Sequence, residues 1–254
     1  MARIVSIHSF RGGTGKSNLT ANLAALTALG GRRVGIVDTD IQSPGIHVLF
    51  GFDEERITRC LNDYLWGRCA IAEAAYDVTA SLAVANPPPA AGMFLIPSSI
   101  RAGEIARVLS DGYDVALLND GFRELMDALR LDHLFIDTHP GLNEETLLSI
   151  AISDLLVVVL RADQQDYQGT AVTVDLARRL EVPEMQMVVN KVLPELGLDA
   201  VRTKVERAYG APVAAVLPLC EDMVRLGSGD IFALRFPDHP LTHAVAAVAR
   251  HVVG

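Results

Sequence analysis

Cysteine, aromatic residues and long hydrophobic runs are all scarce in this chain of 254 residues. The three cysteines, Cys60, Cys69 and Cys220, form no C-x-x-C pair and show no spacing typical of metal ligands. This pattern favours free thiols in a reducing compartment. The longest purely aliphatic run, residues 155–160, is too short to cross a bilayer, and the N-terminus lacks the basic-then-apolar layout of a signal peptide. These absences predict a cytoplasmic protein.

Positive charge is also limited, because 22 lysines and arginines stand against 31 aspartates and glutamates. The formal net charge is −9 and the sequence pI is about 5.2. Such a chain is a poor general binder of nucleic acid or anionic lipid, although a local basic patch could still act. Half of the residues are hydrophobic, and neither repeats nor long linkers divide the chain. We therefore expect residues 1–254 to form a single domain with a substantial core.

Short apolar runs alternate with helical patterns along most of the chain. This order predicts an α/β fold with a mostly parallel, twisted sheet and helices on both of its faces. Residues 52–130 are the least regular part, and they include the loop-forming run Asn86-Pro87-Pro88-Pro89, so this region is a candidate partner-facing insertion. The expected strands cover residues 4–8, 34–38, 94–96, 134–137, 155–160, 186–190 and 213–217. The expected helices cover residues 16–29, 117–130, 145–152, 167–180, 198–209 and 243–252.

A glycine-rich segment, Arg-Gly-Gly-Thr-Gly-Lys-Ser, links the first expected strand to the first helix. Glycines let the backbone curl around phosphate oxygens, and the N–H groups at the start of the helix then face the anion. In such a loop Lys16 reaches the β- and γ-phosphates, and the Ser17 hydroxyl binds Mg²⁺. A glycine-rich turn without a ligand is the alternative. The expected phosphate-binding residues are Arg11, Gly12, Gly13, Thr14, Gly15, Lys16, Ser17 and Asn18.

Carboxylates follow two of the expected strands at their carboxyl ends, where ligands sit in an open parallel sheet. Asp38 and Asp40 are two residues apart, so both can face the phosphate site, although a plain loop cap is the alternative. Asp137 ends a second strand in the manner of a Walker B aspartate, and Gly141 can bring its N–H close to a γ-phosphate. We expect His139, in the same loop, to face solvent or form hydrogen bonds rather than to act in catalysis.

The strict pattern G-x-x-x-x-G-K-[ST] is not met, because Phe10 stands where its first glycine belongs. The segment nearly meets the deviant pattern K-G-G-x-G-K-[ST], and from about residue 3 to 252 the chain resembles the MinD/ParA family of deviant P-loop ATPases. Arg11 takes the place of the family's signature lysine. That lysine contacts the partner's phosphates across a nucleotide-sandwich dimer, so the resemblance implies the same for Arg11, with capping of the loop in cis as the alternative. It also implies that Asp163 lies near the dimer interface.

The same resemblance implies further roles, with Lys16, Asp40 and Arg11 as the catalytic residues. Asp40 in the first switch would orient the attacking water, while Asp38, together with Ser17 and Asp137, would hold Mg²⁺ and its hydration shell. The second switch, D-x-x-x-G, matches residues 137–141. Asn190 and Lys191 would recognise adenine, and Pro218 would lie in a second loop over the base. A simple strand-terminal turn is the alternative for Asn190.

Together these features predict a P-loop NTPase that binds ATP and Mg²⁺ and hydrolyses ATP slowly as a homodimeric switch. The resemblance implies that such a switch positions a cellular structure or cargo and is stimulated by an activating protein partner. Two alternatives remain open. One is a metallochaperone-type ATPase, although no cysteine pair supports it, and the other is a nucleotide-binding regulator without turnover, which Arg11 favours.

The surface on which such a switch would act is not evident from the sequence. The tail, residues 241–254, has one arginine, no lysine and no aromatic residue, so we expect it to pack on the core rather than bind a membrane. The basic residues Arg202, Lys204 and Arg207 read as a solvated helix face rather than a DNA footprint. A peripheral association with membrane or nucleoid is the alternative to a purely cytoplasmic location.

Overall fold

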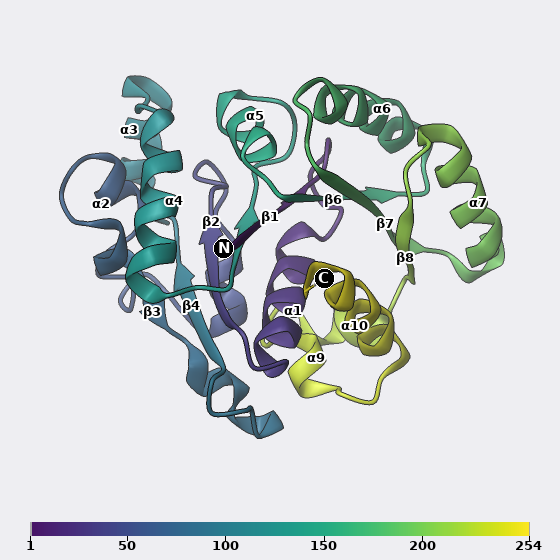
Figure 1. Ribbon diagram of the computed structural model, residues 1–254, viewed down its shortest axis with the longest axis horizontal. Coiled ribbons are helices and arrows are strands. Elements are labelled where there is room, and N and C mark those ends of the chain that lie inside the picture. The colour runs from purple at the N-terminus through teal and green to yellow at the C-terminus, as the bar shows by residue number, and fades with distance from the viewer. Residues whose placement is uncertain (1, 254) are drawn as a thin grey trace.

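One twisted sheet of eight strands organises the computed structural model, which describes residues 2–253 (Figure 1). The strands are β1 (Arg3–His8), β2 (Arg33–Asp38), β3 (Tyr76–Asp77), β4 (Gly92–Ile96), β5 (His133–Asp137), β6 (Leu155–Arg161), β7 (Glu184–Val192) and β8 (Val213–Pro218). Their order is β3-β4-β2-β5-β1-β6-β7-β8, and every described pairing is parallel except that of β3 with β4. The prediction of a mostly parallel sheet is confirmed.

Helices cover both faces of this sheet. They are α1 (Lys16–Leu29), α2 (Leu61–Leu65), α3 (Ala102–Asp111), α4 (Ala116–Leu129), α5 (Glu144–Ala151), α6 (Gln164–Arg179), α7 (Leu198–Tyr209), α8 (Glu221–Leu226), α9 (Phe232–Arg235) and α10 (Pro240–Val253). Short 3-10 turns occupy Ile46–Phe50, Ile71–Ala74, Thr79–Ala85 and Pro194–Leu196. In Figure 1, α1, α9 and α10 lie on one face, while α5 and α6 lie on the other.

Alternating side chains of the buried strands divide the core between the two faces. Leu155, Val157 and Val159 of β6 belong to the apolar cluster that includes α1 and α10. Leu156, Val158 and Leu160, their neighbours along the strand, belong to the cluster under α6 and α7. Strand β6 is therefore buried on both faces, which explains why its sequence is an unbroken aliphatic run rather than an alternating one.

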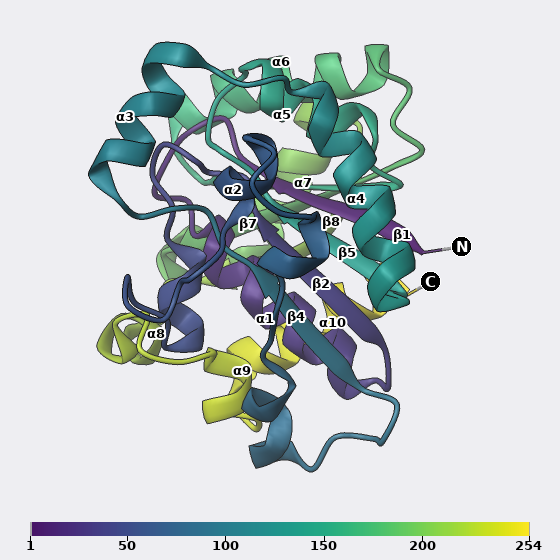
Figure 2. The ribbon, with the colours of Figure 1, turned by 90° about the vertical axis from the view of Figure 1, so that its left-hand side faces the viewer.

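The region expected to be least regular, residues 52–130, contributes directly to the sheet. β4 pairs with β2 from Arg33 to Val37, and its Phe94 and Ile96 pack with Phe122 of α4 in a third apolar cluster. Figure 2, viewed from this side, shows α2, α3 and α4 on the near side of the molecule, above β4 in the view. The sequence did not predict β3, since its two residues are too few for any periodicity to be seen.

The C-terminal helix α10 packs against α1 and β8, as the tail composition predicted. Leu241, Val245, Val248 and Val252 are buried on its inner side. Arg3 also donates from Nη1 to the Val252 carbonyl at 2.7 Å, which satisfies a backbone acceptor at the end of the helix. The apolar face of α10 is therefore occupied by the core, as expected.

Candidate functional site

The loop between β1 and α1 has a backbone shape that only glycine adopts readily. Gly13 and Gly15 have φ angles of +77° and +97°. A Cβ on Gly15 would also lie 2.6 Å from the side-chain nitrogen Nδ2 of Asn190, so this position has no room for a side chain unless Asn190 moves. Helix α1 begins at Lys16 without a side-chain cap, which leaves its first N–H groups available to an anion.

Two residues at the end of β7 hold this loop from the side. Asn190 donates its side-chain amide to the Thr14 carbonyl, and Lys191 donates from Nζ to the Gly13 carbonyl, both at 2.8 Å. Lys191 has a φ of 56°, an unfavourable backbone conformation for a residue with a Cβ, which brings its side chain back over the loop. The structure therefore places the two predicted adenine contacts against the phosphate loop.

A cavity of about 240 Å³ lies beside the same loop. Asn190, Lys191 and Pro218, the residues predicted to contact the base, all line it together with Gly15 and Asn18. The other lining residues include apolar side chains of α8, α9 and α10, which the sequence did not implicate: Met223, Val224, Phe232, Leu241 and Val245. Their sequence signal is weak, because the apolar residues after β8 are scattered among polar ones and also fit an ordinary core. A mostly apolar cleft with a few polar groups suits a planar base.

The predicted carboxylates also converge. Asp38 and Asp137 are register partners on the adjacent strands β2 and β5. Asp38 is fully buried, and its Oδ1 and Oδ2 accept the backbone N–H groups of Asp40 and Gly45 at 3.0 and 3.2 Å. The first switch loop is thus folded around Asp38.

Burial and mutual repulsion disfavour negative charge on both strand-end aspartates. Burial raises the pKa of Asp38 well above its usual range, and the charges of Asp137 and Asp40 add to that effect. Burial also raises the pKa of Asp137 to about 6, against the opposing effects of a hydrogen bond from Ser17 and the charge of Lys16. Burial lowers the pKa of Lys16, although the three carboxylates counteract it. One lysine stands against three carboxylates, which supply the oxygen donors that a hard divalent cation such as Mg²⁺ prefers. Within residues 2–253 no three His, Cys, Asp or Glu side chains converge closely enough to hold a metal ion by themselves, so such an ion would also need Ser17, water or phosphate oxygens.

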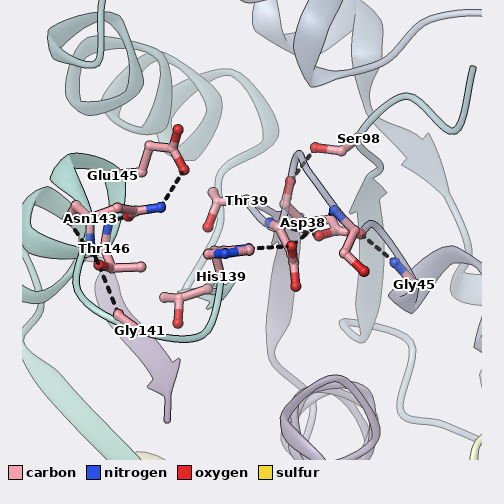
Figure 3. A network of polar contacts seen from close by, with 12 residues as sticks. Asp38, Thr39, Gly45, Ser98, His139, Gly141, Asn143, Glu145 and Thr146 are labelled. Carbon is pink, nitrogen blue, oxygen red and sulfur yellow. Dashed lines mark hydrogen bonds and ion pairs between the residues drawn. The ribbon is translucent and has the colours of Figure 1, made fainter. Parts of the chain in front are cut away.

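The second switch loop is hydrogen-bonded to the first (Figure 3). His139 donates from Nδ1 to Oδ1 of Asp40 at 2.6 Å, so the hydrogen-bonding alternative for this histidine is the one observed. Nearby, His8 is fully buried and pairs through Nδ1 with the Thr138 hydroxyl at 2.8 Å. Burial lowers the pKa of His8 to about 3, so this imidazole is neutral. Its Nε2 atom is also buried and has no hydrogen-bond partner within residues 2–253.

Arg11 lies at the mouth of the loop, near the start of α6. Its Nη1 is 3.8 Å from Oδ1 of Asp166 and 3.9 Å from Oδ1 of Asp163, and both aspartates also pair with Arg161. Asp163 caps α6 by accepting the backbone N–H of Asp166 at 2.9 Å. In a single protomer, Arg11 thus rests on an acidic pair in cis. Its contact with a partner's phosphates stays a prediction.

Phe10, which replaces the first glycine of the strict motif, has a specific neighbour. A Cβ built on Gly169 of α6 would lie only 2.0 Å from Cδ1 of the Phe10 ring. The ring therefore packs directly on the backbone of α6, and the aromatic residue in the loop depends on the glycine in the helix.

Comparison with known proteins agrees with this geometry. The model of the CobQ/CobB/MinD/ParA nucleotide binding domain family matches residues 5–231. The chain belongs to this family. An uncharacterised ATP-binding protein of Methanocaldococcus jannaschii is 27% identical over 258 residues, covering 100% of this chain and 89% of the relative. An iron-sulfur cluster carrier protein of Deinococcus radiodurans is 26% identical over 261 residues, covering 99% and 69%.

Solved structures share the fold of this CobQ/CobB/MinD/ParA domain. The MinD cell division protein of Aquifex aeolicus superposes with a TM-score of 0.81 at 19% identity, covering 100% of this chain and 97% of that protein. The septum site-determining protein MinD of Pyrococcus horikoshii, complexed with Mg-ADP, gives 0.78 at 20% identity and covers 99% and 96%. At this identity the likeness establishes the fold, and the predicted P-loop NTPase architecture is confirmed.

The substitution Asp137→Asn tests the buried charge of the site. Burial raises the pKa of Asp137 from its ordinary 3.8 to about 6, so folding becomes less favourable as the pH rises between these values. Above about pH 6 the wild-type protein carries the full cost of this ionisation, on the order of 2–3 kcal/mol, which asparagine lacks. We expect the nucleotide-free variant to be more stable than the wild type near pH 8 and equally stable near pH 4. Thermal unfolding of both proteins across this range measures the difference, and a gain that does not depend on pH would contradict it.

The substitution Gly169→Ala tests the dependence of the phosphate loop on α6. The added methyl group must displace the Phe10 ring, so we expect a loss of about 1–3 kcal/mol in the free energy of unfolding, with weaker nucleotide binding. Gly103→Ala in α3 is the matched control, because no neighbour lies within 4 Å of its added Cβ. Urea unfolding measures both variants. Combining Gly169→Ala with Phe10→Gly should recover part of the loss, and an additive double variant would show that the two residues do not interact.

Proposed function

We propose that this protein is an ATP-binding, slowly hydrolysing switch whose ATP form is a homodimer that positions a cellular structure or cargo. The observation that supports the proposal most directly is the convergence of the glycine loop, Lys16 and three carboxylates at one edge of the sheet. The Pyrococcus relative complexed with Mg-ADP supports the choice of ligand. The cavity bounded by Asn190, Lys191 and Pro218 would take the adenine.

Each predicted residue has a distinct task in hydrolysis. The loop amides and Lys16 would bind the β- and γ-phosphates, and Gly141 would approach the γ-phosphate without a side chain in the way. Ser17, Asp38 and Asp137 would hold Mg²⁺ and its waters, and the ion would neutralise charge on the phosphate oxygens. Asp40 would orient the attacking water. Arg11 would leave its acidic pair on α6 and contact the partner's phosphates, where it stabilises charge in the transition state.

The structure favours a protein partner over lipid or DNA as the activator. The apolar face of α10 is buried against α1 and β8, so it is not available to a membrane. Two of the three candidate basic residues are already engaged: Arg202 lies 3.7 Å from Glu206, and Lys204 lies over the Tyr167 ring. A phosphate backbone would have to displace these contacts. No helix within residues 2–253 is long and apolar enough to span a bilayer, and we expect the switch to act in the cytoplasm.

Metal-cluster carriage is the second candidate, because the Deinococcus relative is an iron-sulfur cluster carrier protein. It would require thiolates to converge between two copies. Cys60 is buried, and burial raises the pKa of its thiol to about 12, so this cysteine is a poor ligand. The test is elemental analysis for iron and sulfide after anaerobic reconstitution. A stoichiometric cluster bound to the protein would support metal-cluster carriage.

Asp40→Ala and Lys16→Ala separate hydrolysis from binding. Without Asp40 the attacking water loses its orienting group, so we expect turnover to fall by roughly 10²-fold or more while the ATP-bound dimer persists. Without Lys16 we expect nucleotide affinity itself to fall by at least about tenfold, since a buried charge on the phosphates is lost. Light scattering with ATP and phosphate-release assays measure both effects.

Lys204→Ala, on the outer face of α7, serves as the control and should match the wild type in both assays. Wild-type turnover by Asp40→Ala would remove the assigned role of that aspartate. A mass that does not double with a non-hydrolysable ATP analogue would refute the homodimer, and tight ATP binding without any turnover would favour a regulator instead.

A further inference from the structure

The hydrogen bond between His139 and Asp40 uses only one of the two carboxylate oxygens of the aspartate. Oδ1 of Asp40 accepts two hydrogen bonds, from His139 Nδ1 at 2.6 Å and from the backbone N–H of Ser43 at 3.1 Å. A carboxylate has no proton to donate, so Nδ1 of the imidazole carries the shared hydrogen. Both donors engage the same oxygen, which leaves Oδ2 of Asp40 for another donor, such as a water molecule.

The backbone on the Asp40 side of this contact is fixed. Thr39 makes two hydrogen bonds to the carbonyl of Asp137, from its backbone N–H at 2.9 Å and from its hydroxyl at 3.0 Å. The next residue, Asp40, donates its own N–H to Asp38. These bonds attach the start of the first switch loop to the end of β5, so the backbone that carries the Asp40 side chain is held in place.

The backbone on the His139 side is fixed in the same way. Thr138 donates its N–H to the Ile7 carbonyl at 3.3 Å, and Gly141 donates to the Ser9 carbonyl at 3.1 Å. Pro140 follows His139 directly and restricts the histidine backbone to extended conformations. The imidazole therefore projects from a short segment that is hydrogen-bonded to the β1 end at both sides.

We propose that His139 is a positioning residue for ATP hydrolysis: it holds Oδ1 of Asp40 so that Oδ2 remains free to orient the attacking water. This inference rests on the proposed role of Asp40 in hydrolysis. It assigns the imidazole no contact with nucleotide, and His139 acts only through the aspartate. Positioning of this kind affects the chemical step rather than ground-state binding of ATP.

Two substitutions at His139 distinguish positioning from simple packing. In His139→Asn the side-chain amide nitrogen lies close to the place of Nδ1, so it can still donate to Asp40, whereas His139→Ala removes the donor. We expect kcat of the alanine variant to fall by roughly 10- to 100-fold with KM for ATP within about twofold of the wild type. We expect the asparagine variant to recover to within about threefold of the wild-type kcat.

His243→Ala is the control, because this histidine is exposed on α10 and lies outside the site. It should leave kcat and KM unchanged. Turnover of His139→Ala at or above the wild-type rate would overturn the proposal. A His139→Asn variant as slow as His139→Ala would overturn it as well, since hydrogen-bond donation would then not be what matters.

A second measurement detects the hydrogen bond between His139 and Asp40 without requiring ATP hydrolysis. Nitrogen-15 NMR of the nucleotide-free protein at mildly alkaline pH reports which ring nitrogen of His139 carries the proton, with His139→Asn identifying the signal. We expect the Nδ1–H tautomer in the wild type and a shift toward Nε2–H in Asp40→Ala, whose acceptor is gone. An unchanged tautomer in Asp40→Ala would overturn the contact itself. If wild type and His243→Ala both lack turnover while the tautomer shift is seen, the proposed hydrolysis fails and the contact stands.

Discussion

The charge arrangement at the carboxyl edge of the sheet is the constraint around which the loops of the candidate site are folded. The register of β2 and β5 places Asp38 beside Asp137, and burial makes ionisation of both unfavourable. Lys16 offsets only part of that charge, and burial disfavours its ionisation too. A fold that keeps this cluster bears a cost in stability that a bound cation and nucleotide would relieve.

The sequence predicted the parts of the fold that arise from local pattern. The buried run of β6 and the helix at residues 198–209 lie where periodicity placed them, because each carries a strong apolar signal. The misplaced boundaries have local causes. α6 begins at Gln164 rather than Tyr167 because Asp163 caps it, and α10 begins at Pro240, a residue favoured in the first turn of a helix.

Other features depend on contacts between distant residues, which no local pattern reveals. The apolar wall formed by α8, α9 and α10 is one example, because Met223 and Phe232 follow Gly15 by some two hundred residues yet line the same cavity. The double use of Asn190 and Lys191, which hold the phosphate loop as well as facing the cavity, is another. A motif identifies residue types at a site, but only the folded chain shows which of their atoms are already engaged.

Three residues near the glycine loop each have a partner in another element. Phe10 packs on Gly169, His8 pairs with Thr138, and His139 pairs with Asp40. These contacts join β1, α6 and both switch loops into one connected unit. Of the three, the His139–Asp40 contact is the one that joins the two switch loops directly, so it limits how far either loop can move without the other. The sheet itself is held by apolar contacts elsewhere, so these three contacts fix the loops at its edge rather than the sheet.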